Sequence, residues 1–241
     1  MKTLKTGLLV DRHSGVATIT LNHPERANAL DPAQFYALAG LLGDLATEPG
    51  ILAVVLTGQG DRAFCAGLNL RNATAIQTDL ASPGPTGLGA TLRAAASLGR
   101  PLIGRINGAC VAGGMGLLGA CDHVVAVDTA RFGLPEISHG IYPHVAMAGL
   151  HGRGASTVVR RLADTGAMID AAAALDAGLV DVVVPRAELN AALESVLSSI
   201  RSGKMPPHFS ARLPRGSAGA HARLDKAEAA ARKSKINIVN S

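Results

Sequence analysis

Three glycine-containing segments, each expected to follow a β-strand, carry the residues of this sequence that could do chemistry. They are Phe64–Leu70, Ile106–Gly116 and Arg131–Glu136. Gly113-Gly114 is predicted to open a helix, where unpaired N–H groups and the helix dipole favour negative charge. Main-chain donors of this kind stabilise an oxyanion, and losing one typically costs ~3 kcal/mol. Glu136 adds a carboxylate that could move a proton.

The elements that must position these segments alternate between strand and helix. Strands are predicted over 8–10, 16–21, 51–57, 101–107, 123–127 and 179–184, and helices over 91–98, 114–120, 171–177 and 188–200. A further helix should begin after Asp31, because Pro32 suits the first helical position and Gln34 can reach back to the cap. This strand–turn–helix rhythm predicts an α/β fold.

Two stretches lack a regular pattern. Residues 74–90 show no clear period and contain several prolines and glycines, so we expect a mobile loop there. Beyond residue 200, Pro206, Pro207, Pro214, Gly216 and Gly219 are expected to break regular structure, with one helix predicted over 225–233. Residues 1–200 hold 14 Lys and Arg against 16 Asp and Glu, and residues 201–241 hold 9 against 2. The basic tail is therefore expected to be a solvated, loosely ordered end, although a basic segment can also meet an anionic partner.

Composition excludes several classes of function. The chain has 241 residues, of which 48% are hydrophobic and 17% charged, as expected for a globular protein with a core. With 2% aromatic residues and no Trp, it has little to stack on nucleic-acid bases. No apolar run is long enough for a membrane span, so neither nucleic acid nor a membrane is an expected partner. Three cysteines without paired spacing and the lack of a leader segment indicate reduced thiols and a cytoplasmic location. The histidines show no metal-ligand spacing.

In their order and spacing, the segments resemble the crotonase superfamily, the enoyl-CoA hydratase/isomerase family. The resemblance runs from about Val16 to about Glu194. Its motifs are Asn22-His23-Pro24-Glu25-Arg26-Ala27-Asn28-Ala29-Leu30, Phe64-Cys65-Ala66-Gly67-Leu68-Asn69, Ile106-Asn107-Gly108, Gly113-Gly114, Cys121-Asp122, Phe132-Gly133-Leu134-Pro135-Glu136 and Ala177-Gly178-Leu179-Val180. The resemblance implies a spiral of repeated ββα units with a shortened helical C-terminal part. Residues 1–187 would form the core with the acyl-CoA site, and residues 188–241 a short helical and basic tail.

The resemblance also implies site roles. The N–H groups of Leu68 and Gly113 would form an oxyanion hole, and Glu136 would be the acid and base. Coenzyme A would be held by the following residues: Arg26, Ala27, Ala66, Gly67 and Asn69. The substrate would be an acyl-CoA or acyl-carrier thioester, coenzyme A being part of the substrate rather than a separate cofactor. The protein would assemble as a homotrimer or hexamer.

This sequence departs from the family at two positions in the site. The first catalytic glutamate of hydratases falls on Gly116, and His144 falls where some relatives carry a catalytic Asp. A single carboxylate favours 3-enoyl to 2-enoyl isomerisation over hydration, because hydration needs a water to be activated while a proton is delivered. We expect Leu134 and Ile137 to raise the pKa of Glu136 by placing it in apolar surroundings.

Other interpretations of single residues stay open. His144 is either an acid–base or substrate-binding group, or a polar loop histidine. Asn69 is expected to brace its turn, as Asn does. Cys65 is more typical of a small buried side chain than of a nucleophile. Arg71 could meet a phosphate or be solvated.

Alternative functions also stay open. Hydration is the second choice of reaction, and decarboxylation or thioester hydrolysis would use the same enolate. A non-catalytic thioester-binding protein is a further possibility. A dinucleotide-binding domain is the alternative from another class, because Gly114-Met115-Gly116-Leu117-Leu118-Gly119 matches Gly-x-Gly-x-x-Gly. That match lacks a following acidic residue at the expected distance.

Overall fold

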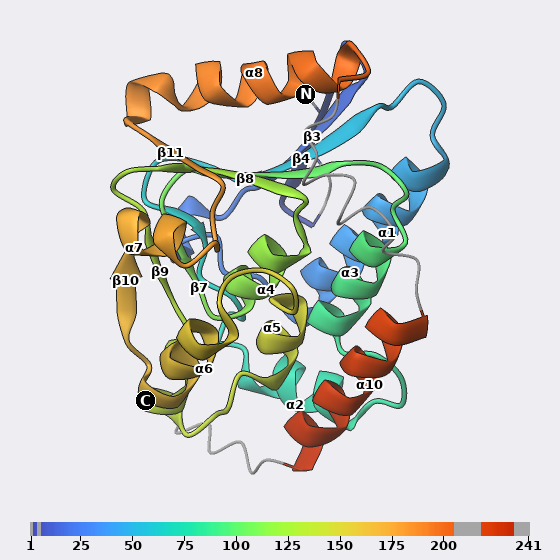
Figure 1. The fold of residues 1–241 in the computed structure, drawn as a ribbon. Coiled ribbons are helices and arrows are strands. Elements are labelled where there is room, and N and C mark those ends of the chain that lie inside the picture. Colours follow the sequence, from blue (N-terminus) through green and yellow to red (C-terminus); the bar gives the residue numbers. More distant parts are fainter. Residues whose placement is uncertain (1, 4–5, 205–217, 234–241) are drawn as a thin grey trace.

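A seven-stranded sheet forms the centre of the computed structural model, which describes residues 2–3, 6–204 and 218–233 (Figure 1). The strands follow the order β1-β2-β3-β4-β6-β8-β11. The first three are antiparallel and the rest are parallel. Their bounds are Lys2–Thr3 (β1), Leu8–His13 (β2), Val16–Leu21 (β3), Ala53–Gly58 (β4), Leu102–Ile106 (β6), His123–Val127 (β8) and Val182–Val184 (β11).

A second sheet of four short strands follows the order β10-β9-β7-β5. Its strands are Ala63–Cys65 (β5), Ala109–Val111 (β7), Arg131–Gly133 (β9) and Met168–Asp170 (β10). Three times, a strand of the large sheet is followed by a strand of the small sheet and then by helix: β4 to β5, β6 to β7 and β8 to β9. The predicted α/β fold of ββα repeats is confirmed. The short sheet carries the chain from each core strand toward the glycine-containing segments.

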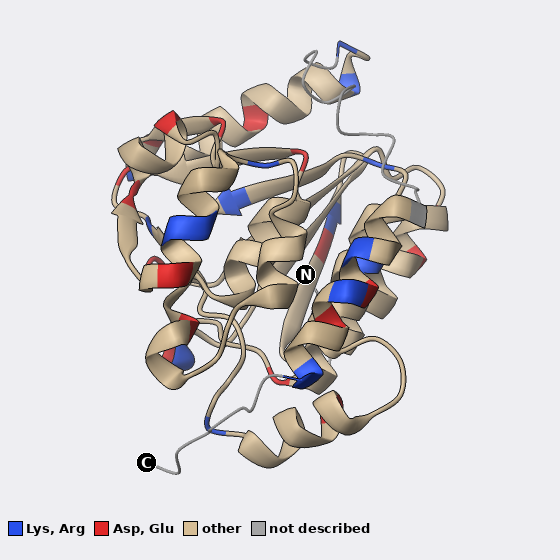
Figure 2. Ribbon diagram, turned by 60° about the horizontal axis from the view of Figure 1, so that its bottom comes forward, with Lys and Arg blue, Asp and Glu red and all other residues tan. Residues whose placement is uncertain are grey.

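The helices cover both faces of the large sheet (Figure 1). They are α1 (Pro32–Thr47), α2 (Ala73–Ala81), α3 (Gly87–Ala96), α4 (Gly113–Ala120), α5 (His144–Gly149), α6 (Ser156–Thr165), α7 (Ala171–Asp176), α8 (Leu189–Arg201) and α10 (Ala218–Lys233). One face of the sheet packs on Leu197 and Ile200 of α8. The other face packs on α1, α3 and α4 in the main core. Charged residues of both signs lie on the outer helices, while α4 and α5 carry no Lys, Arg, Asp or Glu (Figure 2).

The prediction of a mobile loop over residues 74–90 is wrong. That stretch holds most of α2 and the start of α3. Each helix has its own side-chain cap: Asn72 accepts a hydrogen bond from the N–H of Ala75 at 3.3 Å, and Thr86 accepts one from Gly89 at 3.2 Å. Pro83 and Pro85 lie in the turn between the two helices, where a proline interrupts neither helix. Local caps and packing outweigh a weak hydrophobic period here.

The prediction of a loosely ordered tail is wrong for residues 218–233. The helix predicted over 225–233 begins earlier, at Ala218, and Gly219 lies inside it. Leu224 is 4% exposed and Glu228 2% exposed, and α10 packs against α2, α3 and α5. Pro206, Pro207, Pro214 and Gly216 lie outside the described residues. Within the described part of the chain, no helix is long and apolar enough to cross a membrane.

Candidate active site

A cavity of about 190 Å³ lies among the starts of α4 and α5, the 3₁₀ helix η2 (Pro135–His139) and helices α2, α3 and α10. Five of the nine residues predicted for the site line it: Ala66, Leu68, Gly113, Glu136 and His144. Arg26, Ala27, Gly67 and Asn69 do not. Most of the other lining side chains are apolar and come from α2, α3, α5 and the segment after η2. The cavity therefore combines an apolar interior with a few polar groups, as ligand sites do.

The two predicted oxyanion donors lie where two loops touch. Gly67 has a φ of 83°, and a Cβ on it would lie 2.6 Å from the main-chain N of Gly113. Gly113 is the first residue of α4, so its N–H has no partner within the helix. No residue in the described part of the chain accepts a hydrogen bond from the N–H of Leu68 or Gly113. Both residues line the cavity, so the oxyanion hole remains a prediction that this geometry allows.

Main-chain hydrogen bonds hold these loops in place. Leu30 donates to the carbonyl of Gly67 at 2.8 Å, and Asn69 donates to the carbonyl of Leu30 at 2.9 Å. Ala112, the residue before α4, has a φ of 53° and donates to the carbonyl of Gly133 at 3.0 Å. A positive φ at a residue with a Cβ is strained and persists only where the surroundings impose it. Ala112, the strained residue, directly precedes the predicted oxyanion donor Gly113. Strained backbone of this kind is common at functional sites.

Glu136 supplies the carboxylate of the cavity. Its Oε2 atom is buried without a hydrogen-bond partner, and burial raises the pKa of Glu136 to about 7. The predicted rise in the pKa of Glu136 is confirmed; of the two apolar neighbours, Leu134 is fully buried and Ile137 is 42% exposed. A carboxyl group with a pKa near neutrality can both take and return a proton at physiological pH.

The position of the missing carboxylate is filled by another helix. A Cβ on Gly116 would lie 3.1 Å from the Cα of Ala146 in α5. Gly149 approaches Gly116 as closely, since a Cβ on Gly149 would lie 2.7 Å from the carbonyl oxygen of Gly116. A Cβ on Gly119 would overlap the carbonyl oxygen of Gly149. Gly116 and Gly119 of the Gly-x-Gly-x-x-Gly match therefore serve the close packing of α4 on α5, and Gly114 packs against Cys65, which removes the main support for a dinucleotide site.

His144 begins α5 and lines the cavity. Its ring lies 4.9 Å from the ring of Tyr142, and the hydroxyl of Tyr142 donates to Asp164 at 2.8 Å. Burial lowers the pKa of His144. The imidazole is therefore neutral at physiological pH and can donate one hydrogen bond and accept another.

Sequence reasoning missed four polar residues of the cavity, which are Asp79, Thr86, His139 and Tyr142. Asp79 accepts hydrogen bonds from the hydroxyl of Tyr36 at 2.7 Å and from the N–H of Gly87 at 3.1 Å. It was missed because α2 was predicted to be a loop. His139 lies in the same short helix as Glu136, and its nearness to the motif is the only signal that could have found it.

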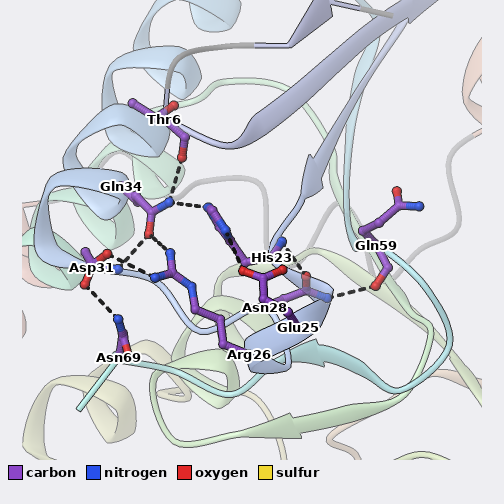
Figure 3. Close-up of polar contacts among 9 residues, drawn as sticks. All are labelled: Thr6, His23, Glu25, Arg26, Asn28, Asp31, Gln34, Gln59 and Asn69. Carbon is purple, nitrogen blue, oxygen red and sulfur yellow. Dashed lines mark hydrogen bonds and ion pairs between the residues drawn. The ribbon is translucent and has the colours of Figure 1, made fainter. Parts of the chain in front are cut away.

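The guanidinium of Arg26 is already engaged by nearby side chains (Figure 3). It donates to Asp31 at 3.3 Å and to Gln34 at 2.7 Å. Asp31 also accepts from Asn69 at 3.1 Å, so Asn69 braces its turn as its residue type predicts. The side chain of Gln34 accepts from the N–H of Asp31 at 2.8 Å, which confirms the predicted helix start. These contacts join the early loop to the segment that carries Leu68.

Asn28 stiffens the same loop from the other side. It has a φ of 56° and is 1% exposed. Its side chain accepts from the N–H of His23 at 2.9 Å and donates to the carbonyl of Gln59 at 3.1 Å (Figure 3). It also donates to the carbonyl of Ala63 at 2.8 Å. Ala66 donates to the carbonyl of Ala27 at 3.0 Å. The main chain around Ala66 is thus fixed at the edge of the cavity.

Two other chemistries find no support in the site. Cys65 is fully buried, and burial raises the pKa of its thiol to about 12, so it is a packing residue as expected. Among residues 2–3, 6–204 and 218–233, no three His, Cys, Asp or Glu side chains are grouped so that they could hold a metal ion.

Known proteins are similar to this chain in both sequence and fold. A family model described as Enoyl-CoA hydratase/isomerase matches residues 11–231. The chain is 35% identical to an (E)-benzylidenesuccinyl-CoA hydratase of Thauera aromatica, over 71% of this chain and 68% of the relative. It is 32% identical to a carnitinyl-CoA dehydratase of Shigella flexneri, over 77% of this chain and 71% of the relative. A solved enoyl-CoA hydratase of Mycobacterium tuberculosis H37Rv superposes with a TM-score of 0.76 at 30% identity, covering 94% of this chain and 97% of that one.

Proposed function

Because the chain belongs to the enoyl-CoA hydratase/isomerase family, whose crotonase fold it shares, we propose that it isomerises 3-enoyl thioesters to 2-enoyl thioesters with Glu136 as acid and base. One observation carries this choice. The cavity holds a single glutamate with a pKa of about 7, and the place of a second carboxylate is filled where Ala146 packs against Gly116.

The reaction follows from the groups around the cavity. The thioester carbonyl oxygen accepts hydrogen bonds from the N–H groups of Leu68 and Gly113, which stabilise the enolate. Ionised Glu136 takes a proton from the α-carbon, and the double bond electrons shift to give a dienolate. The same carboxyl group then returns the proton to the γ-carbon, which leaves the double bond between the α- and β-carbons. No proton, water or electron is gained or lost overall.

The coenzyme A part of the substrate is assigned to the loops at the edge of the cavity. We propose that its adenine meets the main chain around Ala66, with Gly67 and Asn69 shaping that turn. Arg26 and Ala27 would lie along the nucleotide. The guanidinium of Arg26 is already engaged by Asp31 and Gln34, so its contribution would be to brace the loop as well as to attract phosphate.

Hydration is the second candidate, and the names of the relatives favour it, since the similar proteins of T. aromatica and M. tuberculosis are described as hydratases. The other carboxylate of the cavity, Asp79, is engaged by Tyr36 and Gly87, so water activation and proton delivery would both fall on Glu136. His144, which lines the cavity and is neutral, is the other group that could share this work. Decarboxylation and thioester hydrolysis would use the same oxyanion donors, and a protein that only binds thioesters would need no Glu136.

The Glu136→Gln variant tests the proposal. It keeps the shape of the side chain and removes the base, so we expect isomerisation of 3-hexenoyl-CoA to fall by ~10²–10⁴-fold. Affinity for hexanoyl-CoA, measured by calorimetry, should stay within a few-fold because binding rests on other groups. His144→Gln is the matched control and should keep most of the isomerase activity.

Two results would contradict the assignment. Full isomerase activity in Glu136→Gln would exclude Glu136 and direct attention to His144. Efficient hydration of crotonyl-CoA by the natural protein, lost in Glu136→Gln, would mean that one carboxylate suffices for hydration here. Proton exchange at the α-carbon, followed by NMR, separates enolate formation from either product.

A further inference from the structure

Glu228, on the inward face of α10, is a buried carboxylate that the proposed chemistry does not use. It is 2% exposed and accepts hydrogen bonds from the N–H and the hydroxyl of Thr86 at 2.6 and 2.9 Å. Arg93 donates to its other oxygen at 2.8 Å. Because Thr86 caps α3, the carboxylate also lies at the positive end of that helix dipole. These contacts fix α10 on α3, since moving the helix would leave buried charges unpaired.

A second anchor lies one turn further along α10. Arg232 donates to the carbonyls of Leu80 at 3.1 Å and Ser82 at 3.4 Å, and also to that of Gly84. These carbonyls belong to the end of α2 and the turn that follows it. The first anchor, at Glu228, requires α10 and α3 to lie close together, because a Cβ on Gly89 of α3 would overlap Oε1 of Glu228. The C-terminal helix is thus bound to both α2 and α3.

Ala231 lies between the two anchors and lines the cavity. Residues three apart share a helix face, so Ala231 faces the same way as Glu228. The same cavity is also lined by apolar side chains of the helices that hold α10, which are Ile76 and Leu80 of α2 and Leu88 of α3. The helices that hold α10 are therefore the helices that complete the apolar wall beside Ala231.

We infer that α10 closes the acyl-binding part of the cavity and that Ala231 sets the length of the acyl group that fits. This inference rests on the proposed thioester function. With its carbonyl oxygen on Leu68 and Gly113, an acyl chain must run along the apolar wall and meet α10. A cavity of about 190 Å³ is smaller than the ~300–1,000 Å³ usual for ligand sites. The acyl groups selected are short and apolar.

The test measures binding and needs no turnover. Affinities for acetyl-, butanoyl-, hexanoyl- and decanoyl-CoA are measured by calorimetry on the natural protein, Ala231→Leu and Ala222→Leu. Ala222 is an exposed residue of α10 and provides the matched control. The natural protein should bind butanoyl- and hexanoyl-CoA more tightly than decanoyl-CoA. Ala231→Leu should weaken hexanoyl-CoA binding at least about 10-fold and leave acetyl-CoA binding unchanged, because the added carbons fill the end of the cavity. Ala222→Leu should behave as the natural protein.

A complementary variant covers the case in which Ala231→Leu does not fold. Leu80→Ala removes volume from the facing wall, and we expect it to tighten decanoyl-CoA binding about 10-fold relative to butanoyl-CoA. Unchanged chain-length selectivity in a folded Ala231→Leu or Leu80→Ala protein would overturn the role of α10 while leaving the proposed function intact. Failure of the natural protein to bind any of the four thioesters would overturn the proposed function and this inference together.

Discussion

The carboxylate of Glu136 lies in a largely apolar cavity, with one oxygen buried and unpaired. Burial disfavours its charged form, which is why its pKa is raised to about 7. Burial acts on His144 in the opposite sense and lowers its pKa, because the charged form of histidine is the protonated one. Burial thus shifts the two pKa values in opposite directions, and the pH profile of a variant at either position tests which group is the base.

We predict that kcat/KM for isomerisation rises with pH through a single limb near pH 7. The base form of Glu136 is the ionised one, so activity is low below this pKa and reaches a plateau above it. A pH profile from 5.5 to 9 with 3-hexenoyl-CoA measures it. His144→Gln should keep the limb, because the proposed base is Glu136. A limb that disappears in His144→Gln would assign the base to His144 instead.

Gly67 illustrates how a residue without a side chain can control the site. A side chain there would collide with the N of Gly113 and would have to adopt a φ of 83°. We predict that Gly67→Ala lowers kcat/KM by ~100-fold or more, because it displaces an oxyanion donor.

Gly50→Ala is the matched control for this variant. Gly50 has a φ of 79° and no neighbour within 4 Å of an added Cβ. The Gly50→Ala variant should lose ~1 kcal/mol of the free energy of unfolding, because its backbone is strained, and should keep its activity. Equal loss of activity in the two variants would mean that strain, rather than the collision at Gly113, is the cause.

At the scale of elements, the packing of α4 on α5 decides which side chains reach the cavity. Gly116, Gly119 and Gly149 let the two helix backbones approach, and a side chain at position 116 would lie 3.1 Å from the Cα of Ala146, so it would require α5 to shift. The same contact places the first residue of α5, His144, against the cavity. The glycine at position 116 and the place of His144 at the cavity are thus properties of a helix pair, not of a single position.

We predict that Gly149→Ala lowers the free energy of unfolding by ~1–3 kcal/mol, because its Cβ would lie 2.7 Å from the carbonyl oxygen of Gly116. Urea denaturation measures the change. Gly40→Ala, on the exposed face of α1 with nothing within 4 Å of an added Cβ, is the control and should stabilise the protein by ~0.5–1 kcal/mol. A neutral Gly149→Ala would show that the two helices can separate, and would reopen position 116 to a carboxylate.

At the scale of the whole molecule, apolar surface remains outside the core. Ile137, Met168 and Leu175 are between 37% and 42% exposed, and Met168 lies on β10, an edge strand of the small sheet. Burying large apolar side chains between copies would remove them from water. We therefore predict a homotrimer or a hexamer, as the family resemblance implies.

Light scattering at micromolar concentrations should give the mass of three or six chains. Met168→Lys should shift the population toward smaller species, while Leu52→Lys, a control at a residue that is 46% exposed, should not. A single-chain mass for the natural protein would contradict the prediction.

Local sequence determined much of this protein by itself. The longer strands of the large sheet, the start of α1 and the glycine-containing turns follow from residue type and short-range spacing, which act over a few residues, whereas the short strands of the small sheet were not predicted. The family motifs identified Leu68, Gly113, Glu136 and His144, all of which line one cavity. The division at residue 187 remains a prediction.

Only the tertiary structure decided the rest. Helix α2 and the first turn of α3 were missed because their caps and their packing outweigh a weak hydrophobic period, whereas the rest of α3 was predicted. Nothing near Gly116 in the sequence shows that Ala146 fills its space, since the two meet only when α5 folds onto α4. The basic composition of the tail suggested a loose end, yet Glu228 binds Thr86 across 142 residues of sequence. Contacts between distant segments depend on the positions of whole elements, and local sequence patterns do not predict those positions.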